Sequence, residues 1–163
     1  MVNIIQPEQM TLIPPPYRYI IDTCSILSQK SDEPHRRSVY STLWKKIDEM
    51  VLSGEIVICS DIKEEVEDDD LQPWIRQCTI LEVDSVVQQY VTKVVNEHPD
   101  LLSFTNMKSS GDAFLIATAM KYRIAVITEE SKTSPKRIPK ICEVYNISCY
   151  NVTELAEKEG WSF

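Results

Sequence analysis

The stretch "YIIDTCSIL" at residues 19–27 decides the fold, because an apolar run stops there at a single acid. The residues before Asp22 are aromatic or β-branched, and such residues favour a buried strand. The small polar residues Thr23 and Ser25 follow Asp22. As a structural residue, Asp22 could cap a helix that starts at Thr23 or Cys24. As a functional residue, it needs partners elsewhere in the chain.

Further apolar runs of strand length follow, and stretches with helical periodicity separate them. The expected strands lie within residues 55–60, 79–84, 124–130 and 147–152. Short strands that alternate with helices predict an α/β fold around a mainly parallel sheet. We therefore expect a three-layer sandwich whose central sheet has about four to five strands.

The helical stretches also suggest where some helices begin. Residues 35–55 predict a long helix, with an apolar stripe of Val39, Leu43, Ile47, Met50 and Val51. Ser60 is a good N-cap for the helix that follows the second strand, and Thr153 for the last helix.

The chain has 163 residues, 43% of them apolar, which suits one globular domain. We assign residues 17–163 to that domain and residues 1–16 to an extended arm, because Pro14–Pro16 exclude a helix. We expect neither a membrane span nor a signal peptide. The five cysteines have no C-x-x-C spacing, so we expect free, largely buried thiols in a reducing cytoplasm.

The net charge of -8 argues against broad, nonspecific coating of nucleic acid, which relies on an excess of Lys and Arg. It leaves open a local basic patch on an enzyme that acts on nucleic acid. It also leaves open a group of acids that holds metal ions.

Several acids follow the predicted strands. Asp22 ends the first strand, Glu129 and Glu130 end "VITEE", and Asp112 opens the helix of "SSGDAFLIA". Glu65 lies beside the apolar stripe of its helix. Each acid alone has a structural interpretation, as a cap, a helix-dipole partner or a surface charge. Together at the carboxyl edge of a parallel sheet they predict a site for a hard cation, Mg²⁺ or Mn²⁺.

Four pieces of the chain carry a family resemblance: "YIIDTCSIL", "CSDIKEEV", "GDAFLIATAM" and "AVITEES". Together they resemble the PIN-domain nucleases (PilT N-terminus-like), which include the VapC-type ribonuclease toxins of bacterial toxin–antitoxin pairs. The match spans roughly residues 17–150. The tail, from "RIPKICEV" onward, is similar to a PIN-like subgroup described only as a domain of unknown function.

The resemblance implies a role for each matching residue. Asp22 and Asp112 would be primary metal ligands, and Glu65 would be the helix carboxylate, with Glu64 as a substitute. Glu130 would take the position of the family's usual Asp, with Glu129 as the alternative, and Thr128 would orient the cluster. Thr23 and Ser25 would donate hydrogen bonds to water or carboxylate at the metal.

The implied activity is hydrolysis of RNA phosphodiester bonds by a metal-dependent endoribonuclease, the toxin of a toxin–antitoxin pair. Phosphates require cationic contacts, and two basic segments could supply them. Their residues are Arg36, Arg37, Lys132, Lys136, Arg137 and Lys140. The implied partners are RNA and a protein antitoxin that could itself bind DNA, and a homodimer stays open.

Two other hypotheses compete with this one. The first is a catalytically inactive PIN-like module that binds RNA or protein. The second is a receiver-type signalling domain, which also gathers acids around Mg²⁺ at strand ends. That fold has a pair of acids after its first strand and an acceptor Asp at the end of a central strand. Here Asp22 stands alone, and "EIVICS" ends in Ser60.

Overall fold

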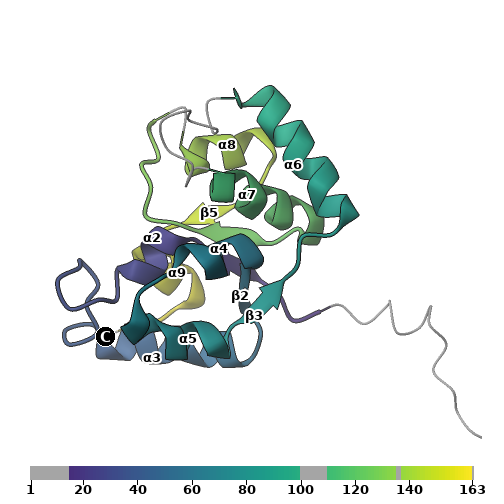
Figure 1. Ribbon diagram of the computed structural model, residues 1–163. Helices are drawn as coiled ribbons and strands as arrows, with labels where there is room; N and C mark the ends of the chain where they lie inside the picture. The colour runs from purple at the N-terminus through teal and green to yellow at the C-terminus, as the bar shows by residue number, and fades with distance from the viewer. Residues whose placement is uncertain (1–14, 100–109, 135–136, 163) are drawn as a thin grey trace, which may run out of the picture.

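The structure is a computed structural model and describes residues 15–99, 110–134 and 137–162. Its centre is a five-stranded parallel sheet in the order β3-β2-β1-β4-β5 (Figure 1). The strands are β1 (Tyr19–Ile21), β2 (Ile56–Cys59), β3 (Thr79–Leu81), β4 (Ala125–Ile127) and β5 (Cys149–Tyr150). The predicted α/β fold is therefore confirmed. Residues 1–14 of the predicted arm lie outside the described residues.

Helices cover both faces of the sheet. In Figure 1, α6, α7 and α8 lie above the sheet, and α3 and α5 lie below it. The helices are α2 (Thr23–Leu27), α3 (Ser41–Leu52), α4 (Ser60–Glu65), α5 (Gln72–Gln77), α6 (Ser85–Glu97), α7 (Ser110–Tyr122), α8 (Ile138–Val144) and α9 (Val152–Glu159), with a 3-10 turn η1 (Asp69–Leu71). This gives the three layers that the alternating pattern predicted.

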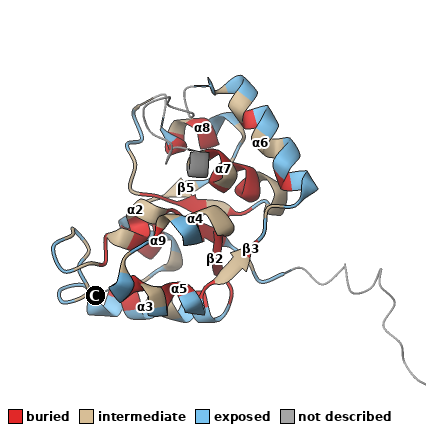
Figure 2. Cartoon of the chain, viewed as in Figure 1, coloured by how far each residue is buried: buried red, intermediate tan, exposed pale blue. Residues whose placement is uncertain are grey.

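The core lies on both faces of the central strands. Every residue of β1 and β2 is buried, as Figure 2 shows for the middle of the molecule. Helix α7 is apolar around most of its circumference, because it packs against the sheet on one side and against α6 on the other. Leu115, Ile116, Ala117 and Ala119, which together cover several sides of the helix, are therefore all fully buried.

Several details of the predicted helices were wrong. Val39 precedes α3 and is 66% exposed, although the other stripe residues are buried. Cys59, not Ser60, is the N-cap of α4, and no side-chain hydrogen bond caps it. Asn151, not Thr153, caps α9. Helix α9 begins after Asn151 because the Asn151 side chain accepts from the backbone N–H of Glu154 (2.8 Å).

The strand order reverses at β1. The chain builds outward from β1 through β2 to β3, and then crosses back to place β4 on the other side of β1. In open parallel sheets, ligands bind at the carboxyl ends of the strands where the order reverses. Asp22 leaves β1 at this point, and its backbone N–H donates to the carbonyl of Ile127 at the end of β4 (2.8 Å).

The observed order also differs from the 2-1-3-4-5 order of receiver-type domains. The receiver hypothesis is therefore excluded by topology. Among the described residues, no helix is both long and apolar enough to cross a membrane.

Candidate functional site

Asp22 is both a helix cap and the centre of a hydrogen-bonded cluster. Its side chain is 4% exposed and accepts from the backbone N–H of Thr23 (2.8 Å), which caps α2. The second carboxylate oxygen accepts from the hydroxyl of Thr128 (2.8 Å) and contacts the thiol of Cys24 (3.0 Å). Burial raises the pKa of Asp22, and these donors oppose that rise because they stabilise the charged form.

The structure separates Glu65 from Glu64. The hydroxyl of Thr23 donates to a carboxylate oxygen of Glu65 (2.6 Å), so α4 turns this side chain toward α2. Glu64 is exposed. One helical residue changes the direction by about 100°, so only one of two adjacent acids can face the sheet edge. The geometry places Glu65 beside Asp22, as the apolar stripe of α4 predicted.

Asp112 and Glu130 complete the group of acids. Burial raises the pKa of Asp112, and the nearby carboxylates of Glu130, Asp22 and Glu65 act in the same direction, so that together they bring this pKa to about 8. Burial also raises the pKa of Glu130, although the backbone N–H of Ile138 donates to it (3.2 Å). We call Asp22, Glu65, Asp112 and Glu130 the carboxylate cluster. Two strand ends, those of β1 and β4, and two helices, α4 and α7, bring its members to one edge of the sheet.

Glu129 points away from the carboxylate cluster. Its carboxylate accepts from the hydroxyl of Ser25 (3.0 Å) and from the backbone N–H of Val152 (3.0 Å). The imidazole Nδ1 of His35 lies 3.6 Å from its other oxygen. Ser25 therefore links α2 to α9 through Glu129. The hydroxyls of Thr23 and Thr128 instead donate to members of the carboxylate cluster, Glu65 and Asp22.

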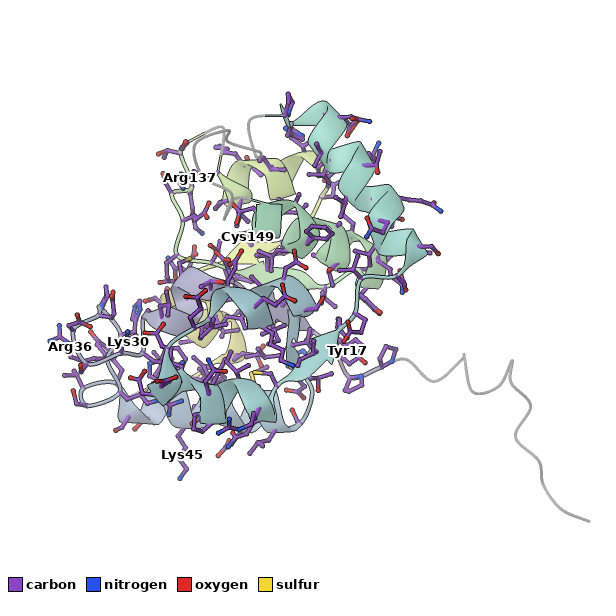
Figure 3. The ribbon with its side chains drawn as sticks, viewed as in Figure 1. Tyr17, Lys30, Arg36, Lys45, Arg137 and Cys149 are labelled. Carbon is purple, nitrogen blue, oxygen red and sulfur yellow. The ribbon has the colours of Figure 1, made fainter. Side chains whose placement is uncertain are left out.

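The predicted RNA-binding cations lie in different environments. Among the described residues, Arg137, labelled in Figure 3, is the only one of these cations whose charge lowers the pKa of cluster members, namely Asp112 and Glu130. Arg37 is held by Asp48 through two bonds of 2.7 and 2.8 Å. The remaining residues are Arg36, which bonds to the carbonyl of Glu33; Lys132, paired with Glu154; Lys140, paired with Glu143; and Lys136, outside the described residues.

The donor set of the carboxylate cluster suits a divalent cation. All four side chains offer oxygen, and hard cations such as Mg²⁺ prefer oxygen. Burial and the neighbouring carboxylates raise the pKa of Asp112, which indicates that several acids are crowded at this edge of the sheet. Among the described residues, however, no three His, Cys, Asp or Glu side chains already stand close enough together to hold a metal ion. A cation would have to draw the carboxylates inward.

Cys24 also lies at the site, although no sequence pattern pointed to it. Its sulfur contacts Asp22, lies 3.3 Å from the hydroxyl of Thr128 and accepts from the backbone N–H of Glu129 (3.3 Å). Burial and the neighbouring Asp22 raise the pKa of this thiol, which keeps it neutral. All five cysteines are free, as predicted.

The fold and the site together define a PIN-like α/β domain with an acidic sheet edge. The chain belongs to the family named Domain of unknown function (DUF4411), whose sequence profile matches residues 19–163. No curated protein shows significant sequence similarity to the chain.

Seven chains of solved structures are similar to this one. One of them comes from the structure of FitAB bound to the IR36 DNA fragment. It is 14% identical, with a TM-score of 0.50, and the match covers 82% of this chain and 94% of that chain. At this level of identity the likeness concerns the fold.

Proposed function

We propose that this protein is a Mg²⁺- or Mn²⁺-dependent endoribonuclease of the cytoplasm. The observation that carries the proposal is the carboxylate cluster at the switch point of a PIN-like sheet, with the pKa of Asp112 raised to about 8. Burying several like charges together is costly without a cation, so the cluster suits a metal-dependent reaction. The sequence resemblance to PIN-domain nucleases supports RNA as the substrate.

Asp22, Asp112, Glu65 and Glu130 would hold the metal. A divalent ion there would supply an activated nucleophile and offset the charge that develops on the phosphate. Thr128 and the backbone of Thr23 fix the carboxylate of Asp22, so that its two oxygens keep one orientation. Arg137 is the cation best placed to meet a substrate phosphate, because its charge already acts on Asp112 and Glu130.

Cleavage of single-stranded RNA by the purified protein tests the proposal. We expect cleavage with Mg²⁺ or Mn²⁺ and none after chelation. Asp22→Asn and Asp112→Asn should each lower the rate at least about a hundredfold, because even residues behind a ligand cost 10–100-fold. Retained cleavage in both variants would contradict the assigned site.

Two adjacent pairs of acids give matched controls for the same assay. Glu65→Gln and Glu130→Gln should lower the rate sharply, because these side chains belong to the carboxylate cluster. Glu64→Gln should leave the rate unchanged, since Glu64 is exposed. Equal effects of Glu64→Gln and Glu65→Gln would show that the cluster does not direct the chemistry.

We further propose that the nuclease is the toxin of a toxin–antitoxin pair with a protein antitoxin. The resemblance to VapC-type toxins supports this role. FitAB, whose fold is similar, has been solved on DNA, which is compatible with an antitoxin that binds DNA. Induced expression in a bacterium should arrest growth with the wild type and not with Asp22→Asn. Equal growth of both would argue against a toxin.

A catalytically inactive module that binds RNA or protein is the second candidate. Its support is that no three metal-binding side chains among the described residues already stand in a coordinating arrangement. A module of this kind would bind RNA without cleaving it, and Asp112→Asn would leave the binding unchanged or strengthen it by removing a negative charge.

A further inference from the structure

A large pocket lies at the opposite edge of the sheet from the carboxylate cluster. Its volume is about 740 Å³, within the range that small-molecule ligands occupy. Its walls come from the starts of β1 and β4, from β5 and the loop before it, and from α6, α7 and α9. In Figure 3, Tyr17 at this pocket and Arg137 near the cluster lie on opposite sides of the molecule. The pocket is therefore a separate feature.

The pocket is cationic in an acidic protein. Three cations line it, namely Arg18, Arg123 and Lys158, and no Asp or Glu is among the lining residues. The chain as a whole has a net charge of -8. Arg18 is engaged, because its guanidinium makes bonds of 3.0 and 2.6 Å to Glu159. In the described part of the chain, the structure records no ion pair for Arg123 or Lys158. The Lys158 ammonium lies 5.7 Å from the centroid of the Tyr150 ring and its charge acts on Glu159, so Arg123 is the lining cation most able to meet an anion.

The backbone conformation at Arg123 also supports a binding role for its side chain in this pocket. Arg123 and Asn146 have φ values of 55° and 57°, and they are the only non-glycine residues with positive φ in the described part of the chain. Both line the pocket. The left-handed position after a helix usually holds glycine, because any side chain there is strained. An arginine in this conformation suggests that the guanidinium has a use that offsets the strain.

Aromatic rings form much of the pocket wall, although Tyr19 is only 1% exposed and its hydroxyl donates to Glu159, so the other tyrosines offer the accessible ring surface. The five tyrosines of the pocket are Tyr17, Tyr19, Tyr90, Tyr145 and Tyr150. Aromatic side chains stack with nucleobases whatever their sequence, and adjacent cations hold the phosphates. An inorganic anion or an acidic peptide would use only the cations. A nucleotide would use both the cations and the rings, so the combined lining favours it.

We infer that this pocket binds a nucleotide, with its phosphate on Arg123 and Lys158 and its base against the tyrosines. The nucleotide is either free or part of a single RNA strand, since both offer the same chemistry. The inference does not depend on cleavage by the carboxylate cluster, which lies at the other edge of the sheet.

Calorimetric titration of the full chain without divalent metal tests the inference. The probes are UMP, AMP, inorganic phosphate and a single-stranded uridine oligomer. We expect UMP and AMP to bind at one site and Arg123→Gly to weaken them at least about tenfold, as expected for the loss of a charge-assisted contact. Glycine suits the left-handed backbone, so the melting temperature of this variant should equal or exceed that of the wild type.

Two further variants separate the contribution of a tyrosine ring to nucleotide binding from any effect of the carboxylate cluster. Tyr90→Leu should weaken nucleotide binding about fivefold or more, the lower limit for loss of one stacked base, and leave phosphate binding unchanged. Asp112→Asn should bind nucleotides like the wild type, even where it has lost RNA cleavage. This variant distinguishes failure of the pocket from failure of the proposed nuclease.

The outcomes distinguish the possible ligands. Tighter binding of the oligomer than of UMP would identify an RNA strand as the source, and equal binding would identify free nucleotides. Phosphate binding as tight as nucleotide binding would overturn the inference and leave a simple anion site. Nucleotide binding unaffected by Arg123→Gly, or no binding by any probe, would also overturn it.

Discussion

At the scale of single residues, Asp22 combines two roles that the sequence presented as alternatives. One carboxylate oxygen caps α2 through the backbone of Thr23, and the other faces Cys24 and Thr128. A carboxylate has enough acceptor sites for both tasks. The cap therefore fixes the orientation of a side chain that belongs to the carboxylate cluster.

Thr128→Val tests how much this orientation depends on one hydroxyl. Valine keeps the shape of threonine and removes the donor to a buried carboxylate. We expect the free energy of unfolding to fall by about 1–3 kcal/mol, the usual cost of leaving a buried polar group without its partner. Urea denaturation measures this change. Thr128→Ser keeps the donor and should lose less stability than Thr128→Val, so the reverse ranking would contradict the role of the hydroxyl.

The sequence indicated some of these residues and could not indicate others. The apolar stripe of α4 was enough to favour Glu65 over Glu64, because helical geometry fixes side-chain directions locally. The direction of Glu129 depends on α9, which comes later in the chain. Cys24 meets Thr128 only because β1 and β4 pair in one register, and no local pattern reports that pairing.

At the scale of elements, the sequence indicated the five strands and several helices, but not α5. It did not indicate α8 either. The first residues of α8, "IPK", follow a basic stretch with another proline, which is typical of a loop. Proline is nevertheless compatible with the first turn of a helix, and Pro139 occupies that turn. Ile138 and Ile141 are buried, so packing against the core holds α8 in place. Lys140 therefore lies on a helix and not on a basic loop.

Helix α9 offers a test of capping. Asn151 accepts from the backbone of Glu154 (2.8 Å), and the Glu154 side chain accepts from the backbone of Asn151 (2.9 Å). Asn151→Ala should lower the free energy of unfolding by about 1 kcal/mol. Thr153→Ala should have little effect, because Thr153 is exposed inside the helix. Urea denaturation compares the two variants, and equal losses would contradict the assigned cap.

At the scale of the whole molecule, the sheet edge couples charge to stability. The pKa of Asp112 is about 8 in the folded protein and 3.8 in its ordinary state. Between these values the folded state binds a proton that the unfolded state lacks, so stability falls as pH rises. The contribution is fully present below pH 3.8 and is lost as pH rises through about 8. Burial raises the pKa of Asp22 and Glu130 too, and their contributions have the same sign.

We therefore expect the melting temperature of the metal-free protein to fall between about pH 5 and about pH 9. Mg²⁺ or Mn²⁺ should raise it most at the upper end, where the carboxylates are charged and repel one another. Asp112→Asn should flatten the pH profile and weaken the metal effect. Thermal unfolding followed by circular dichroism measures all three. A profile that rises with pH, or an unchanged slope in the variant, would contradict the electrostatic description of the cluster.

The strand order has a consequence for the protein during its synthesis. β1 is made first among the strands but lies at the middle of the sheet, and its contact between Thr128 and Asp22 spans 106 residues. A growing chain on the ribosome can pair β1 with β2 early, because that loop closes within the first part of the chain. Strand β4, the other neighbour of β1, and the cluster residues Asp112 and Glu130 are translated much later. The acidic edge can therefore be assembled only after the chain has been translated through Glu130.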